Sequence, residues 1–272
     1  MSFPFVKGHG TRNDFIVLPD LDGSLHGELA PSVVTALCDR RGGLGADGVL
    51  RVLAADSGDG EGDGARWFMD YRNADGSVSQ TCGNGLRVFA RYLQAFGLAD
   101  ASVPLRIDTR DGVKTATFCD DGDVSVAMGT VVVGSAVKVA VEGRSYVARA
   151  VDMGNPHAVA VVDSLSEAGS LRDAPDVEES DFPAGVNVEF VVLRGNHDLA
   201  MRVFERGVGE TASCGSGACA AAAAVAAHDG GPRPTTYMVG VPGGELSVTL
   251  HADGEVHLKG PAVLVAEGTW TA

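Results

Sequence analysis

Two cysteines stand at the start of the same short pattern, about half a chain length apart. Cys82 lies in the segment TCGNG and Cys214 in the segment SCGSG. Each Cys-Gly-x-Gly turn precedes a run with helical character, so the thiol would sit beside the first unpaired backbone N–H groups of a helix. Such a helix start can bind a carboxylate, and its field favours the thiolate and lowers the cysteine pKa. One turn of this kind would predict a nucleophilic cysteine.

The presence of two such turns instead predicts an acid–base pair. In a two-base device, one thiolate removes a proton from carbon and a second thiol returns a proton to the opposite face. An enzyme that inverts a stereocentre needs this pair. The other cysteines lack the turn, and we interpret them as packing residues: Cys38, Cys119 and Cys219. A regulatory disulfide between the two turns is an alternative that a cytosolic chain disfavours.

Two helices must position these thiols. In the first half, apolar residues recur at spacings of three and four from Leu86 to Phe96, which predicts an amphipathic helix that ends before Gly97. In the second half, the almost unbroken alanines of residues 218–227 predict a helix that is enclosed on all sides.

Short strands are predicted before and after each helix, so both halves read as strands, a Cys-Gly-x-Gly turn, a helix and more strands. This repeated order suggests duplication. A further helix is predicted from Pro31 to near Arg41, and the acidic, glycine-rich residues 56–64 are expected to be a solvated connector. The predicted strands cover residues 2–10, 15–18, 66–71, 103–109, 124–128, 137–141, 187–193, 199–205, 245–250 and 255–260.

Composition limits the possible partners. The 272-residue chain is 45% apolar and carries a formal net charge of −15, which disfavours nucleic acid and anionic membranes and fits a small-molecule substrate. Its N-terminal segment lacks the pattern of a signal peptide, and no apolar run reaches the length of a membrane span, so we expect a cytoplasmic protein. The five cysteines show neither a CxxC pair nor zinc spacing, and we expect no metal site.

Polar residues of the types that bind both ends of an amino acid occur along the chain. Taken alone, each asparagine reads as a turn residue, the histidine as a loop residue and the Glu-Arg pair as a surface ion pair. These residues are Asn13, Asn73, Asn155, His157, Asn187, Glu205 and Arg206.

Several segments together resemble the diaminopimelate epimerase family. They follow the family's order over most of the chain, and several are specific to that family rather than to the wider group with proline racemases. The segments are HGTRNDF (9–15), DRRGGLGADGVL (39–50), RNADGSVSQTCGNGLRVFARYL (72–93), MGNPHAV (153–159), GVNVEFV (185–191), FERGVGETASCGSGACAAA (204–222) and GPA (260–262).

This resemblance implies an isomerase that needs no cofactor and converts LL-2,6-diaminoheptanedioate to the meso form, in lysine and peptidoglycan precursor synthesis. It also implies an α/β (α+β) fold of two similar halves related by pseudo-twofold symmetry, each a set of strands wrapped around a central helix. We expect residues 1–129 to form the half that carries Cys82 and residues 130–272 the half that carries Cys214, with the last strand able to return to the first half. A homodimer is expected by resemblance only.

The resemblance also implies residue roles. Cys82 and Cys214 are then the acid and the base, and His157 and Glu205 tune the two thiols. The substrate-binding positions implied are Asn13, Asn73, Gly83, Asn84, Asn155, Asn187, Glu205, Arg206, Gly215 and Ser216. The chain departs from many relatives at Arg12, where they have glycine, and at Ser216, where they have threonine. Gly48 replaces a polar contact residue of some relatives and receives no binding role.

Two alternative functions stay open. Another epimerase of the same fold would act on a monocarboxylate such as proline or hydroxyproline, although the asparagines and Arg206 favour a substrate with a second polar end. A glycine-rich nucleotide-binding protein is the alternative from another class. No lysine follows the glycines as in a P-loop, which disfavours it. Which thiol is the base in the forward direction is not assigned.

Overall fold

The computed structural model describes residues 2–55 and 64–271. The acidic connector expected at 56–64 lies outside the described residues except for Gly64. The described chain divides into two compact units. Unit 1 comprises Met1–Val126 together with Gly260–Ala272, and unit 2 comprises Ala127–Lys259.

Unit 1 is built from strands around one long helix, and a short helix packs against the strand β3. Its strands neighbour each other in the order β18, β1, β2, β3, β4, β5, β6, β7, and the pairs β2–β3 and β4–β5 are parallel. The elements are β1 (Ser2–Gly10), β2 (Asn13–Pro19), α1 (Pro31–Cys38), β3 (Gly48–Ala54), β4 (Trp67–Asn73), α2 (Gly83–Ala95), β5 (Leu105–Asp108), β6 (Lys114–Phe118), β7 (Val124–Thr130) and β18 (Val263–Thr271).

Unit 2 has the same plan. Its strands follow the order β8, β9, β10, β12, β13, β15, β16, β17, and the pairs β10–β12 and β13–β15 are parallel. The elements are β8 (Val132–Val141), β9 (Arg144–Asp152), β10 (Pro156–Val161), η2 (Leu165–Ala168), β11 (Asp176–Val177), β12 (Asn187–Gly195), β13 (Asp198–Glu205), β14 (Gly209–Glu210), α3 (Gly215–Asp229), β15 (Thr235–Val241), β16 (Gly244–Leu250) and β17 (Glu255–Gly260).

The two orders match strand for strand and direction for direction. In each unit the main helix lies in the connection between two parallel strands, α2 between β4 and β5 and α3 between β13 and β15. The first strand of the series differs in origin: β18 in unit 1 comes from the far end of the chain, whereas β8 in unit 2 directly precedes its partner β9. The duplication that the sequence suggested is therefore present in the topology.

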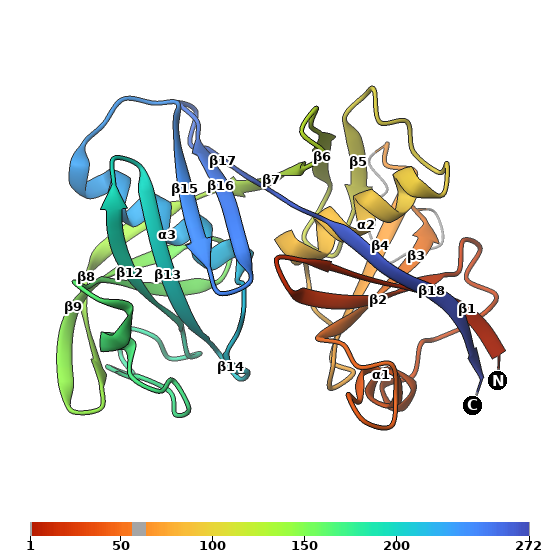
Figure 1. Ribbon diagram of the computed structural model, residues 1–272, viewed down its shortest axis with the longest axis horizontal. Helices are drawn as coiled ribbons and strands as arrows, with labels where there is room; N and C mark the ends of the chain where they lie inside the picture. The colour runs from red at the N-terminus through yellow and green to blue at the C-terminus, as the bar shows by residue number, and fades with distance from the viewer. Residues whose placement is uncertain (1, 56–63, 272) are drawn as a thin grey trace. The chain divides into compact units, whose positions relative to one another are not determined.

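Each main helix is enclosed by the strands of its unit (Figure 1). The helix α2 contacts β1, β2, β3, β4, β6 and β18, and α3 contacts β8, β9, β10, β12, β13, β15 and β16. Burial on all sides explains the alanines of α3, whose small side chains let strands approach closely. The prediction of an enclosed alanine helix is confirmed.

The first main helix differs from its prediction. An amphipathic α2 would expose one polar face, yet Asn84 and Arg87 on that face are 1% and 0% exposed. Arg87 donates hydrogen bonds to the Thr11 hydroxyl and to the Pro261 carbonyl, so its charge is held inside the unit. The expected apolar position Phe96 lies at the C-terminal end of the helix and is 45% exposed. The polar residues at the start of α2 are therefore internal, whereas Arg91 and Gln94 farther along the helix are partly exposed.

Other boundaries shift by only a few residues. The helix α1 ends at Cys38, before the expected Arg41, because Asp39 takes an extended conformation and accepts N–H bonds from the next turn. The strand pairing β1–β18 sets Ser2 opposite Thr271, so both ends of the chain lie in unit 1 (Figure 1). The predicted fold class is confirmed: a mixed α/β fold of two similar halves, each with strands around a central helix.

Candidate active site

Cys82 is the N-cap residue of α2. Its backbone is extended, its Sγ accepts the Gly85 N–H at 3.4 Å, and its carbonyl accepts the Leu86 N–H at 2.8 Å. A Cβ at Gly85 would lie 3.2 Å from the Leu50 side chain, so glycine lets the helix start close against β3. The turn therefore places the thiol at the end of the helix where backbone N–H groups point outward.

Asn13 brings an amide to the same place. The Cys82 thiol lies 3.8 Å from Asn13 Oδ1, and Asn84 Nδ2 donates to this oxygen at 3.1 Å. Asn13 begins β2, directly after the turn of Thr11 and Arg12. Both turn residues have positive φ, +48° and +64°, which is a conformation that favours glycine. Arg12 therefore occupies a backbone conformation that glycine adopts without strain.

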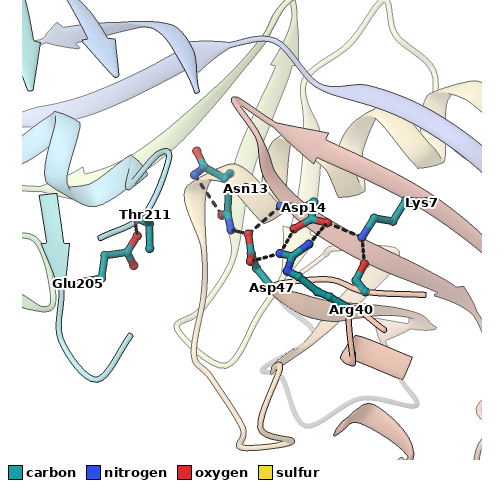
Figure 2. A network of polar contacts seen from close by, with 9 residues as sticks. Lys7, Asn13, Asp14, Arg40, Asp47, Glu205 and Thr211 are labelled. Carbon is teal, nitrogen blue, oxygen red and sulfur yellow. Dashed lines mark hydrogen bonds and ion pairs between the residues drawn. The ribbon is translucent and has the colours of Figure 1, made fainter. Parts of the chain in front are cut away.

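A charged network fixes the other side of Asn13 (Figure 2). Asn13 Nδ2 donates to Asp47 Oδ2 at 2.8 Å, and Arg40 joins Asp47 to Asp14 with contacts of 2.6 and 2.7 Å. Lys7 completes the network with a 2.5 Å ion pair to Asp14. Burial raises the pKa of Asp14, but hydrogen bonds from Arg40 and Lys7 outweigh it and hold the pKa at about 2.

Asn73 lies at the end of β4, opposite Gly48 on β3. Its side chain donates to the Ser77 hydroxyl at 3.0 Å and so also closes the turn that follows the strand. A Cβ at Gly48 would lie 2.6 Å from the Arg72 carbonyl, which gives Gly48 a packing reason. The Asn73 side chain therefore stabilises the turn that follows β4.

Cys214 repeats the geometry of Cys82 in unit 2. It is the N-cap residue of α3, and its Sγ accepts the Gly217 N–H at 3.3 Å. The Ser216 hydroxyl lies 3.6 Å from the same sulfur. Its side chain is buried, at 7% exposed. Both cysteines thus occupy the same position in topologically equivalent units.

A chain of polar groups leads away from Cys214. Asn155 Nδ2 donates to Ser216 Oγ at 3.4 Å, and Asn155 Oδ1 lies 3.0 Å from His157 Nε2. The other ring nitrogen of His157, Nδ1, lies 2.7 Å from Glu189 Oε1. His157 and Glu189 are both fully buried. The histidine therefore belongs to the interior of unit 2 and is not a loop residue.

The expected lowering of the thiol pKa is wrong for Cys214. Burial, together with the carboxylates of Glu205 and Glu189, raises its pKa well above the usual value, and contacts from Ser216 and the Gly217 N–H oppose this only in part. The helix start does contribute as the sequence suggested. The sequence pattern could not reveal the burial of the sulfur or the approach of two carboxylates from other strands.

Asn187 and Arg206, two candidate substrate-binding residues, contact each other at the end of β13. The Asn187 side chain donates to the Pro156 carbonyl at 3.1 Å and accepts the Arg206 backbone N–H at 3.0 Å. Arg206 also donates from its guanidinium to the Ala184 carbonyl at 2.8 Å. Asn187 thereby fixes the segment that carries Glu205 and Arg206.

The Glu205 carboxylate accepts a short hydrogen bond from the Thr211 hydroxyl (Figure 2). It is also one of the carboxylates that raise the Cys214 pKa. Glu205 therefore acts electrostatically on the Cys214 thiol, and its role in tuning that thiol stays a prediction.

Sequence patterns did not single out Glu189 or Asp47. Glu189 interrupts the apolar run from Val188 to Val192, and a carboxylate inside a buried strand is the signal that could have identified it. Asp47 was part of a glycine-rich turn, and only the folded chain shows that it holds Asn13.

Unit 1 also has a cavity of about 660 Å³ that is separate from the candidate active site. Its lining includes Arg51, Asp70, Arg72 and Arg110, and none of the candidate site residues. Asp70 forms ion pairs with the three arginines, so this lining is an ion-paired network.

Within residues 2–55 and 64–271, no helix is long and apolar enough to cross a membrane. The same ranges hold no group of three His, Cys, Asp or Glu residues placed to bind a metal ion.

Solved structures with a similar fold include epimerases. A hydroxyproline epimerase from Agrobacterium vitis with bound trans-4-hydroxy-L-proline matches with a TM-score of 0.70 and 17% identity, over 98% of this chain and 92% of that chain. A protein of the PhzF phenazine biosynthesis family from Bacillus anthracis matches with a TM-score of 0.73 and 15% identity, over the full length of both chains. At these identities the likeness concerns the fold alone.

Sequence relatives are more specific. The chain is 52% identical over 274 residues to the diaminopimelate epimerase of Streptomyces coelicolor, covering 97% of this chain and 94% of that protein. It is 46% identical over 277 residues to the diaminopimelate epimerase of Corynebacterium glutamicum, covering 98% of each. A family model described as diaminopimelate epimerase matches residues 5–134 and 149–265. The resemblance seen in the motifs is confirmed, and the chain belongs to the diaminopimelate epimerase family.

Proposed function

We propose that this protein converts LL-2,6-diaminoheptanedioate to meso-2,6-diaminoheptanedioate, without a cofactor, by a two-thiol acid–base mechanism. One observation carries the proposal: two units of the same topology each place a cysteine as the N-cap of their enclosed helix. Membership of the diaminopimelate epimerase family supports the choice of substrate. The two units would be the epimerase halves that we expected at residues 1–129 and 130–272, with Cys82 and Cys214 acting on opposite faces of one carbon.

The chemistry needs stabilisation of a carbanion, because the α-hydrogen of an amino acid is a very weak acid. Two helix N-termini directed at one substrate carboxylate would supply fixed positive potential where negative charge develops. The N–H groups from Gly83, Asn84, Gly215 and Ser216 would hold this carboxylate. The distal end of the substrate would be bound by Arg206, Glu205 and the four asparagines Asn13, Asn73, Asn155 and Asn187, where a guanidinium suits a bidentate carboxylate contact.

The raised pKa of Cys214 fits the role of the acid. Because its pKa is raised, Cys214 is a neutral thiol at pH 7, which is the form that returns a proton to carbon. We propose that Cys82 is then the base in the same half-reaction. In the reverse reaction, from the meso to the LL form, the two thiols exchange these roles by microscopic reversibility.

The test is to incubate the protein with LL-2,6-diaminoheptanedioate in deuterium oxide. We expect deuterium at the α-carbon and formation of the meso product, detected by mass spectrometry and chiral chromatography. No exchange and no meso product with the native protein would overturn the proposal. L-Proline and trans-4-hydroxy-L-proline in parallel tubes separate the rival epimerase, which would turn over a monocarboxylate.

Variants of the thiols test the mechanism. Cys82→Ala and Cys214→Ala should each lower epimerisation by about 10²–10⁴-fold, the range typical for loss of a positioned acid or base. Cys119→Ala is the matched control, since this cysteine lies outside both helix-start turns, and it should keep native turnover. Near-native turnover of either single variant would exclude the two-thiol mechanism.

A homodimer and a cytoplasmic location are also proposals, and they rest on the family resemblance. Light scattering that gives the mass of a single chain would contradict the homodimer. Recovery of the enzyme outside the cytoplasm in cell fractions would contradict the location.

A further inference from the structure

Asp47, directly before β3, contacts the segments that carry both candidate substrate-binding asparagines of unit 1. Its Oδ2 accepts the side-chain Nδ2 of Asn13 at 2.8 Å and the backbone N–H of Asp14 at 3.0 Å. Its backbone carbonyl accepts the N–H of Ala74, the residue after Asn73, at 3.1 Å. The mechanism proposed above does not use Asp47, although it joins two parts of the candidate site.

Arg40 holds the Asp47 carboxylate in place (Figure 2). Its Nη2 forms a 2.6 Å ion pair with Asp47 Oδ1 and a 2.7 Å ion pair with Asp14 Oδ1. The Asp47 side chain is 42% exposed, so packing alone does not define its position. The guanidinium of Arg40 and the two N–H donors define it instead, because hydrogen bonds to an ionised group are short and strong.

The chemistry of a carboxylate fixes which way the Asn13 amide faces. An ionised carboxylate has only acceptor atoms, whereas an amide side chain has an NH₂ donor on one side and an oxygen acceptor on the other. Asn13 therefore turns its nitrogen to Asp47. Its Oδ1 faces the start of α2, where it accepts Asn84 Nδ2 at 3.1 Å and lies 3.8 Å from Cys82 Sγ.

An acceptor at this position selects the substrate group that can bind there. An ammonium group has only donors and a carboxylate has only acceptors, so the Asn13 oxygen favours the ammonium and disfavours the carboxylate. The opposite orientation of the amide would present the NH₂ group and would favour a carboxylate. The contact with Asp47 thus decides which charged group of an amino acid Asn13 can bind.

We propose that Asp47 is a positioning residue that, through Asn13, presents a hydrogen-bond acceptor to an ammonium group of the amino-acid substrate. Arg40 supports this role because it holds the carboxylate against Asn13. The inference rests on the proposed function, in which Asn13 is a substrate contact.

Steady-state kinetics with LL-2,6-diaminoheptanedioate test this role. Asp47→Ala should raise KM about tenfold, as expected for one lost hydrogen bond to a charged group, while kcat changes by less than about threefold. Asp14→Asn is the matched control, since it removes a carboxylate that binds Lys7 and Arg40 rather than the Asn13 side chain. Its KM should stay within about twofold of the parent value. An unchanged KM in Asp47→Ala would overturn the proposal.

An exchange of the two side chains tests the direction of the Asn13 amide. Asn13→Asp alone places two carboxylates at hydrogen-bonding distance and should raise KM at least as much as Asp47→Ala. When Asn13→Asp is combined with Asp47→Asn, the new amide donates to the new carboxylate, which again presents an acceptor to the substrate. The KM of this double variant should return to within about threefold of the parent value. If Asn13 instead offered its NH₂ group to the substrate, KM would stay raised, and the proposal would be wrong.

Nuclear magnetic resonance tests the contact without turnover. In the nitrogen-15-labelled parent protein, the side-chain NH₂ signals of Asn13 are identified by their loss in Asn13→Asp. These hydrogens should exchange with water at least about tenfold more slowly than those of the exposed Asn196, because Asp47 holds the Asn13 nitrogen. Exchange as fast as at Asn196 would overturn the proposal. A failure of the epimerase assignment would appear separately, as a parent protein without turnover that still shows slow exchange at Asn13.

Discussion

Residues beside the two thiols differ although the turn is the same. Cys82 lies against the amide of Asn13, whereas Cys214 faces the hydroxyl of Ser216 and two carboxylates act on it. The two sulfurs therefore have chemically unequal surroundings. An enzyme that takes a proton on one face and gives one on the other benefits from this difference, since one thiol must start ionised and the other neutral.

The Asp14 network predicts a pH dependence of stability. The carboxyl pKa falls from 3.8 to about 2 on folding, so the unfolded chain binds more protons at low pH. The resulting stabilisation is complete above about pH 4 and is lost as the pH falls toward 2. We expect it to contribute about 1–2 kcal/mol, reduced because the network is partly exposed to solvent.

Asp14→Asn isolates this effect. Urea unfolding at several values between pH 6 and pH 2 should show the variant less stable than the parent at pH 6, with a difference that shrinks by about 1–2 kcal/mol as the pH falls to 2. The Asn variant lacks the carboxylate at every pH, so only the parent loses this stabilisation as the pH falls. The difference in stability between the two proteins therefore narrows. A constant gap over the whole range would mean that Asp14 titrates alike in both states.

At the scale of the elements, both main helices are internal. The alanines of α3 from Ala220 to Ala223 are fully buried, and strands cover the helix on all sides. Cores of this kind tolerate added volume poorly, because neighbouring strands cannot move apart without breaking their hydrogen bonds. The same enclosure holds the N-terminus of the helix, and with it Cys214, in a fixed position.

Ala221→Leu tests this packing. We expect a loss of about 3 kcal/mol in the free energy of unfolding, since the added side chain has no space next to α3. Ala227→Leu, at an exposed position of the same helix, is the matched control and should change stability by less than about 0.5 kcal/mol. Equal effects of both substitutions in chemical denaturation would show that α3 is not enclosed.

At the scale of the whole molecule, the chain leaves unit 1 within β7, after Val126, and returns to it at Gly260, just before β18. The pairing of β1 with β18 places both ends of the chain in the same pair of strands. Unit 1 therefore depends on residues from both ends of the sequence. Unit 2 is continuous, and its equivalent strand is β8.

A circular permutant tests this arrangement. The two ends are joined by a short glycine-serine linker, and new ends are opened between Ala252 and Asp253, in the exposed turn from β16 to β17. We expect the parent's circular dichroism spectrum and a stability within about 2 kcal/mol of the parent, because only a loop closure changes. A permutant opened between Val88 and Phe89, inside α2, is the control that should not fold. Failure of the first permutant would contradict the pairing of the two ends.

The sequence by itself determined the local features. A cysteine followed by Gly-x-Gly at a helix start is set by a few neighbouring residues, and so are the helices and most strands. The family also followed from short motifs, because these carry their information in residue identity and spacing. These motifs alone predict the site residues Asn13, Asn155 and His157, although a motif says nothing of the contacts each side chain makes.

Only the tertiary structure decided the chemical state of these residues. The meeting of Glu189 with His157 requires the parallel pairing of β10 with β12, and the support of Asn13 requires Asp47 and Arg40 from another segment. The raised pKa of Cys214 follows from burial and from the carboxylates of Glu205, at the end of β13, and Glu189, within β12. Short windows of sequence contain none of these long-range contacts. The pattern of α2 suggested an exposed polar face, and the strands around the start of the helix make Asn84 and Arg87 on that face internal.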